Sequence, residues 1–254
     1  TSTEVDAAIS IDGEHSGLKH GDKVRVLTGT AAHVATALIW GDRKAISEGK
    51  AFVRLRFDTP VIVHTKQRGV LRRLSPAQTL GGLQIVDPAP ARMKRRDPLR
   101  LSVFEAVETS DVLSLTKALC DASKGVASLR DLKRLLGGQQ EAVNEVALDG
   151  FEPIRPGHVA RIETVTEAKD AFLEALSGSL ERNPAQTARP ASELNASLAS
   201  TFAEPLLDHV ARTLLETGAL TGSLNALALP DRDPFENLSK VRRQKIAHIE
   251  TALR

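Results

Sequence analysis

The chain has 254 residues, of which 41% are hydrophobic and 26% are charged, a composition typical of a globular protein. No apolar run is long enough to span a bilayer and no secretory signal opens the chain, so a membrane partner is not expected. The single cysteine, Cys120, excludes an internal disulfide and fits a reducing compartment. Cys120 lies in a helical pattern, which favours buried packing over nucleophilic catalysis.

The net charge of +2 is unevenly distributed along the chain. Residues 1–100 hold 17 Lys and Arg against 10 Asp and Glu, an excess of seven positive charges. The remaining residues hold 17 against 22, an excess of five negative charges. A basic first part favours a polyanionic partner, and ordinary scatter of solvated surface charge explains the same balance equally well.

The first 90 residues carry the pattern of a small β-barrel. Apolar residues alternate with polar ones or follow each other in short β-branched runs, with turn residues between the runs and no helical period. These features predict about six short strands that close into a barrel over residues 1–90. The clearest runs are residues 5–11, 23–27, 34–40 and 51–57.

Residues 55–88 contain the most specific motifs of the chain. Asp-Thr-Pro at 58–60, Ser-Pro at 75–76 and Gly-Gly at 81–82 interrupt the β-branched runs. Each of these motifs predicts a turn, because Pro and Gly set backbone angles that regular ladders do not use. The Gly-Gly pair lacks the Lys and the helix that follow a phosphate-binding loop, so we expect it to be a barrel turn.

Residues 55–88 also resemble the third domain of translational GTPases, and most of all that of the SelB family of selenocysteine-specific elongation factors. The resemblance rests on a strand ending in Pro, a strand ending in Val-Leu-Arg, then Ser-Pro-Ala-x-Thr-x-Gly-Gly and Asp-Pro. It extends back to Leu-Lys-His-Gly at 18–21, Val-Arg-Val at 24–26 and Gly-Thr-Ala at 29–31. The chain departs from the family pattern at Leu27, Gln67 and Leu83. The resemblance implies a barrel that helps to hold aminoacylated tRNA.

A group of basic residues within this stretch forms a candidate RNA-binding surface. Its members lie within eight residues of each other and are Lys66, Arg68, Arg72 and Arg73. The resemblance implies that a basic barrel face meets the tRNA backbone, where Arg and Lys contact phosphates without reading sequence. The alternative is that Arg68 and Arg72 pair with Asp58 or Asp87 inside the fold.

A basic linker follows the barrel over residues 91–97. Lys94, Arg95 and Arg96 either contact RNA phosphates by displacing condensed counterions or belong to a solvated hinge. The linker ends where Asp97 and Pro98 predict a helix start, with a capping carboxylate followed by Pro at the first helical position.

The chain after the linker predicts two tandem winged-helix domains, at 98–163 and 164–230. In the first domain, apolar residues at helical spacing predict helices that begin at residues 98 and 111. A short helix capped by Ser128, a helix over 139–148 and a hairpin around 155–157 are expected to follow. This succession of helices followed by a hairpin is the winged-helix order.

The same order recurs about sixty residues later. Helices are expected over 166–182, from a cap at Ser192, and over 205–216, followed by a hairpin within 220–229. Residues 231–254 predict an extra helix, which either begins a further winged helix or packs back on the second. The expected fold class is therefore multidomain: an all-β elongation-factor-type barrel followed by tandem winged-helix (α+β) domains.

No catalytic, cofactor-binding or metal-binding residues are expected in this chain. It contains no Gly-x-x-x-x-Gly-Lys-Ser/Thr loop, and its seven His residues show no paired ligand spacing. No nucleophile elbow is present either. The chain starts at Thr1 and its only Met is Met93, so we expect a piece of a longer protein. The resemblance implies that GTP and Mg²⁺ belong to an N-terminal GTPase domain of that parent.

The resemblance implies that this chain is a non-catalytic, cytoplasmic and monomeric part of a SelB-type factor. Its partners would be selenocysteinyl-tRNA and the ribosome paused at a recoded stop codon. The mRNA insertion-element hairpin would be bound by regions beyond this chain. Acidic residues in the expected third helices oppose nucleic-acid docking, so we expect the winged helices to act as a spacer arm. These residues are Glu141, Glu145, Glu204, Asp208 and Glu216.

Two rival functions remain open at the level of sequence. A winged-helix transcription regulator with a β-barrel sensor domain predicts a basic third helix, which the sequence lacks. An enzyme of unknown chemistry predicts convergent titratable groups, which no motif supports.

Overall fold

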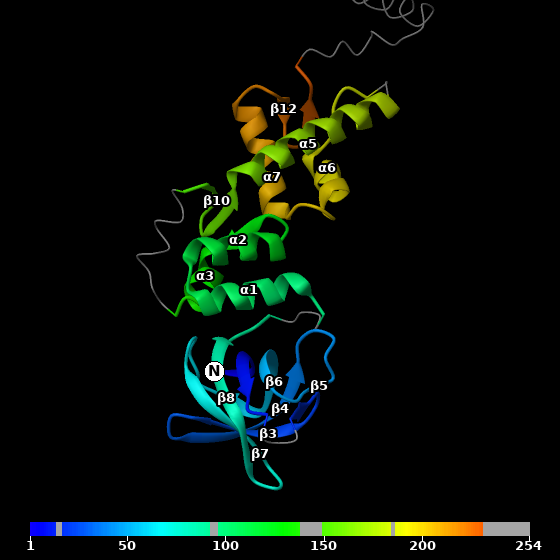
Figure 1. The fold of residues 1–254 in the computed structure, drawn as a ribbon. Helices are drawn as coiled ribbons and strands as arrows, with labels where there is room; N and C mark the ends of the chain where they lie inside the picture. Colours follow the sequence, from blue (N-terminus) through cyan, green and yellow to red (C-terminus); the bar gives the residue numbers. More distant parts are fainter. Residues whose placement is uncertain (14–16, 92–95, 138–148, 184–185, 231–254) are drawn as a thin grey trace, which may run out of the picture. The chain divides into compact units, whose positions relative to one another are not determined.

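The computed structural model describes residues 1–13, 17–91, 96–137, 149–183 and 186–230. The chain divides into two compact units, Thr1–Val159 and Ala160–Arg254. The first unit contains a β-barrel and a group of helices with a small sheet, and the second contains three helices and a hairpin in its described part. Figure 1 shows the elements of both units along the chain.

Six antiparallel strands form a closed barrel in the order β1-β6-β4-β3-β7-β8 (Figure 1). Inward residues along each strand alternate with outward ones, as the period of two predicts. Val5, Ala7 and Ile9 of the first strand, for example, are at most 2% exposed and belong to the barrel core. The strands are β1 Ser2–Ile11, β3 Lys23–Thr28, β4 Ala31–Ile39, β6 Gly49–Val61, β7 Arg68–Arg73 and β8 Gln78–Asp87. The barrel predicted for the first part of the chain is confirmed.

Two of the three predicted turns in residues 55–88 are wrong. The Asp-Thr-Pro motif lies inside β6, where the pairing with β1 is irregular between Ser2 and Glu4, and this irregularity accommodates a proline. Gly81 and Gly82 lie inside β8. A Cβ on Gly81 would come within 1.8 Å of the Ser10 carbonyl oxygen, so this glycine allows the first and last strands to pass closely. The Ser-Pro motif does lie in the turn between β7 and β8.

The helical part of the first unit begins where the sequence predicts. Asp97 caps α1 (Pro98–Thr109), and its carboxylate accepts a hydrogen bond of 3.1 Å from the Leu99 N–H. The remaining elements are α2 Val112–Ala122, β9 Val126–Ser128, α3 Leu129–Leu135, β10 Phe151–Arg155 and β11 His158–Arg161. The three strands pair in the order β10-β11-β9. Cys120 is fully buried in α2, as expected. The helix expected over 139–148 lies outside the described residues.

We expect Asp97→Ala to lower the free energy of unfolding by about 1 kcal/mol, because it removes the acceptor of an otherwise unpaired helical N–H. Asp97→Asn is the control, since an asparagine oxygen can accept the same bond. Urea denaturation of the whole chain measures both. Equal losses in the two variants would contradict a capping role for this side chain.

The described part of the second unit contains α5 (Ile162–Arg182), α6 (Ala191–Leu198), α7 (Glu204–Glu216) and a hairpin of two short strands. The hairpin strands are β12 Thr221–Ser223 and β13 Ala226–Ala228. The first helix begins four residues before the predicted start, and its first turn is largely exposed, with burial beginning at Val165. Pro190, not Ser192, occupies the cap of α6.

No helix in the described part of the chain is long and apolar enough to cross a membrane. The extra helix predicted over 231–254 lies outside the described residues. The finer domain boundaries at residues 90, 97, 163 and 230 stay predictions.

Candidate nucleic-acid interface

An exposed face of the barrel carries a row of basic residues on β3 and β7. Val24 and Val26 of β3 point into the core, each 1% exposed, so Arg25 between them points outward. On β7, Leu71 is fully buried and its neighbour Arg72 points outward. The two strands pair so that Arg25 lies directly opposite Arg72.

The Arg25–Arg72 pair is electrostatically unfavourable as it stands. Like charges directly opposite each other on neighbouring strands destabilise a sheet. No hydrogen bond or ion pair joins either side chain to another group in the described ranges, and the buried Nε atom of Arg72 lacks an acceptor. This arrangement would be relieved by an anion placed between the two guanidinium groups.

The predicted basic group does not form one surface. Arg68 is exposed and lies on the same outward face as Arg72, because the two are four residues apart on one strand. Arg73 lies opposite the buried Val24, at one end of the barrel, where its Nη2 donates a 2.6 Å hydrogen bond to the Gly17 carbonyl. Lys66 occupies a left-handed backbone position in the turn before β7.

The linker cations are only partly described. Arg96 forms a 2.8 Å ion pair with Asp42, and both side chains are largely exposed. Lys94 and Arg95 lie outside the described residues. Arg25 was missed as a site residue, although the alternation of Lys and Arg with Val at 23–26 places it on the solvent face.

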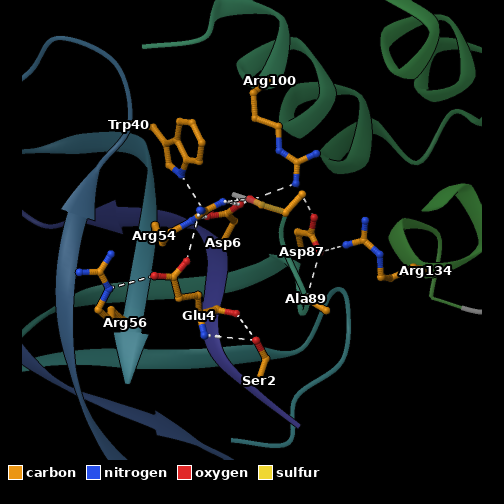
Figure 2. A network of polar contacts seen from close by, with 11 residues as sticks. Ser2, Glu4, Asp6, Trp40, Arg54, Arg56, Asp87, Ala89, Arg100 and Arg134 are labelled. Atoms are coloured by element: carbon orange, nitrogen blue, oxygen red, sulfur yellow. Dashed lines mark hydrogen bonds and ion pairs between the residues drawn. The ribbon is translucent and has the colours of Figure 1, made fainter. Parts of the chain in front are cut away.

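The suggested pairing of Arg68 or Arg72 with Asp87 is not found. Asp87 belongs instead to a buried polar network between the barrel and the first helices (Figure 2). Asp6 on β1 lies opposite Asp87 on β8 and both residues are fully buried. This acidic pair is the counterpart of the Arg25–Arg72 pair, but here the protein supplies the opposite charges itself.

Asp6 is neutralised mainly from within the barrel. Arg54 on β6 donates from Nε to Asp6 Oδ1 at 2.9 Å and from Nη2 to Oδ2 at 3.0 Å, a bidentate arrangement. The Trp40 indole N–H donates to the same carboxylate at 3.1 Å. Arg56, by contrast, pairs with Glu4 on the exposed surface at 2.9 Å (Figure 2).

Asp87 is neutralised from the helices. Arg100 of α1 and Arg134 of α3 both donate to its carboxylate, and the Ala89 N–H adds a bond of 3.0 Å. Thr65, in the loop before β7, donates its hydroxyl to the Arg134 carbonyl at 2.7 Å. The network therefore joins the first and last strands of the barrel to two helices, and we call it the barrel–helix junction.

Burial in the junction affects the pKa values of its three arginines. Burial lowers the pKa of Arg100, and the nearby Arg54 charge acts in the same direction against the favourable charge of Asp6. Burial likewise lowers the pKa of Arg134, with Asp6 opposing it. For Arg54 burial also acts to lower the pKa, but hydrogen bonding and the charge of Asp6, with Glu4, outweigh it and raise the pKa. Arginine stays protonated throughout the physiological range, so these groups act as fixed charges and not as proton donors.

Aromatic packing surrounds the ionic part of the junction. Phe104 of α1 is fully buried and lies 5.3 Å from the Trp40 ring in a T-shaped arrangement and 5.2 Å from Phe52. The Arg100 guanidinium carbon lies 4.9 Å from the Phe104 ring centroid. The core of the helical group thus includes barrel residues, among them Trp40 and Val86. The carboxylates of Asp6 and Asp87 are both paired with arginines of the junction, which favours a structural role, although the buried Nε atom of Arg100 has no acceptor.

A closed antiparallel barrel followed by helices and small sheets is consistent with the multidomain fold of elongation-factor-type proteins. A search of solved structures finds this fold in a chain described as the crystal structure of bacterial selenocysteine-specific elongation factor EF-Sec, with a TM-score of 0.59. The match has 16% sequence identity and covers 98% of this chain and 38% of that chain. No family model and no curated protein matches the sequence. The resemblance to SelB is therefore confirmed at the level of the fold.

Proposed function

We propose that this chain is the non-catalytic, C-terminal part of a selenocysteine-specific elongation factor, in which the barrel helps to hold selenocysteinyl-tRNA. The observation that carries the proposal is the uncompensated Arg25–Arg72 pair on an exposed barrel face. A phosphate of a tRNA backbone would supply the missing negative charge. The fold similarity over 98% of the chain supports a role in translation. GTP and Mg²⁺ would belong to a domain outside this chain.

The elements after the barrel are proposed to be two winged helices that act as a spacer arm toward the mRNA-binding end of the factor. Support comes from α7, the last helix before the second hairpin, which stands where a winged helix carries its reading helix. Glu204, Asp208 and Glu216 of α7 are all exposed, and such a surface repels a phosphate backbone. The junction supports rigidity at the base of this arm, since it ties α1 and α3 to the barrel.

We expect the double variant Arg25→Gln/Arg72→Gln to bind selenocysteine tRNA about tenfold more weakly than the unmodified chain at physiological salt. Each exposed ion pair contributes up to about 1 kcal/mol, and the slope of log affinity against log salt should fall by about two. Filter binding or fluorescence anisotropy across a salt series measures both. Arg56→Gln is the matched control, because Arg56 is an exposed barrel arginine whose charge is already paired with Glu4.

Three other outcomes of the same assay would change the proposal. Unchanged tRNA affinity in the double variant would remove the β3–β7 face from the RNA interface. Tight binding of the mRNA insertion-element hairpin would turn the proposed spacer into a reader. A preference for duplex DNA would favour the second candidate, a winged-helix regulator with a barrel sensor domain.

A further inference from the structure

A hollow at one end of the barrel has a positively charged lining. Its volume is about 430 Å³, which lies within the range of small-ligand sites. Val24 and Leu80 belong to its lining, but each is 1% exposed and packs in the barrel core. The remaining lining residues are Lys19, Asp22, Lys23, Arg73, Leu74 and Ser75. We call this site the barrel-end hollow.

Of the three cations that line the hollow, Arg73 is held in place and the two lysines are available to a ligand. Arg73 is positioned by its 2.6 Å hydrogen bond to the Gly17 carbonyl. Lys19 and Lys23 are exposed, and neither ammonium group pairs with a carboxylate in the part of the chain that the structure describes. The one acidic lining residue, Asp22, already accepts a 2.8 Å hydrogen bond from the Lys19 backbone N–H. The lining therefore carries a net charge of two positive units.

Other hollows of the protein have the opposite charge. A hollow of about 430 Å³ beside α6 and α7 is lined by Glu204 and Asp208 without a cation. A hollow of about 400 Å³ beside α1 is lined by two cations, Arg43 and Lys50, and by three carboxylates. A general excess of surface cations would not produce this difference, so the charge of the barrel-end hollow is specific to it.

We propose that the barrel-end hollow binds a phosphate group carried on a body of nucleotide size. Lys19, Lys23 and the Ser75 hydroxyl are groups that bind phosphate oxygens, and Arg73 adds a fixed positive charge. The volume of about 430 Å³ suits a ligand larger than phosphate alone. The phosphate can come from a free nucleotide or from an RNA strand. This site is distinct from the Arg25–Arg72 pair, whose side chains do not line the hollow.

The test is titration of the full chain with a nucleoside 5′-monophosphate, followed by calorimetry and by amide chemical shifts. We expect a dissociation constant of about 1 mM, and shifts gathered at Lys19, Lys23 and Leu74. The double variant Lys19→Gln/Lys23→Gln should bind about tenfold more weakly, since each exposed ion pair contributes up to about 1 kcal/mol. Both lysines are exposed, so the variant should unfold at the same temperature as the unmodified chain.

Lys50→Gln is the matched control, since it removes an exposed barrel lysine from the hollow with three carboxylates. Inorganic phosphate and the unphosphorylated nucleoside complete the series, and only the phosphorylated ligands should respond to the Lys19→Gln/Lys23→Gln change. Competition between the mononucleotide and a short single-stranded RNA would identify an RNA strand as the source, and simultaneous binding would identify a free nucleotide.

Absence of binding, or binding that the double lysine variant leaves unchanged, would overturn the proposal. Neither result depends on tRNA affinity, so the barrel-end hollow and the proposed function can fail separately.

Discussion

Replacing Asp87 with alanine should lower the free energy of unfolding by about 3–5 kcal/mol, because it removes the buried carboxylate to which both Arg100 and Arg134 donate. Arg100 then keeps only Asp6 at 3.7 Å, and Arg134 keeps the half-exposed Asp131 at 2.9 Å. Arg100 is 5% exposed and Arg134 is about three-quarters buried, so neither can recover full hydration in place. Burial already lowers the pKa of both groups, which indicates that their charges are poorly solvated even with Asp87 present. Urea denaturation of the whole chain measures the loss.

Asp42→Ala is the matched control for this experiment. It also removes an aspartate from an arginine, but the Asp42–Arg96 pair is exposed and is expected to contribute less than 1 kcal/mol. The triple variant Asp87→Ala/Arg100→Met/Arg134→Met should recover much of the stability, since removing all the charges of a buried group is less harmful than removing one. A loss under 1 kcal/mol for Asp87→Ala alone would show that the junction is open to water.

The second large effect is expected for Phe104→Ala, at about 3–5 kcal/mol. Phe104 is fully buried and its ring contacts Trp40 and Phe52 from the barrel, so the substitution leaves a cavity between the barrel and α1. Trp40 is the only tryptophan of the chain, so its fluorescence reports on this contact. We expect its emission to shift to the red in the native state of the variant, as water reaches the indole.

Phe172→Ala provides the matched control, because Phe172 is equally buried but lies on α5 of the second unit. It should destabilise that unit by a similar amount and leave the native emission of Trp40 unchanged. If Phe104→Ala also left the emission unchanged, the aromatic contact would not hold the barrel and α1 together.

The sequence predicts most of the barrel because each strand carries its own local signal. Alternation at 23–27 places Val24 and Val26 inside, and the same rule places Arg25 on the surface. Asp97 and Pro98 predict the start of α1 for the same reason, since a capping residue acts on its own helix. Local signals fail where contact with a distant strand decides the structural role of a residue. From its neighbours in sequence Gly81 is expected in a turn, but in the structure it lies in a strand and leaves room for the Ser10 carbonyl oxygen of the neighbouring strand.

The candidate site is less predictable because it depends on register. Arg68, Arg72 and Arg73 are neighbours in sequence, yet Arg73 is directed to the barrel end and the partner of Arg72 is Arg25, 47 positions away. The junction cannot be predicted locally for the same reason. Its carboxylates lie on the first and last strands of the barrel, and its arginines lie on β6 and on two helices. In the second unit, Ser192 was a plausible cap by residue type, but Pro190 precedes the first helical residue.

The position of Asp6 and Asp87 on the first and last barrel strands has a consequence for the order of assembly. These two residues become neighbours only when β1 pairs with β8, the step that closes the cylinder. The carboxylate that pairs with Arg100 and Arg134 therefore reaches its final position only after closure. On an open sheet, α1 and α3 lack the complete set of contacts that hold them to the barrel. Pairing of strands so far apart in sequence is intrinsically slow. Docking of α1 and α3 should therefore follow closure of the barrel.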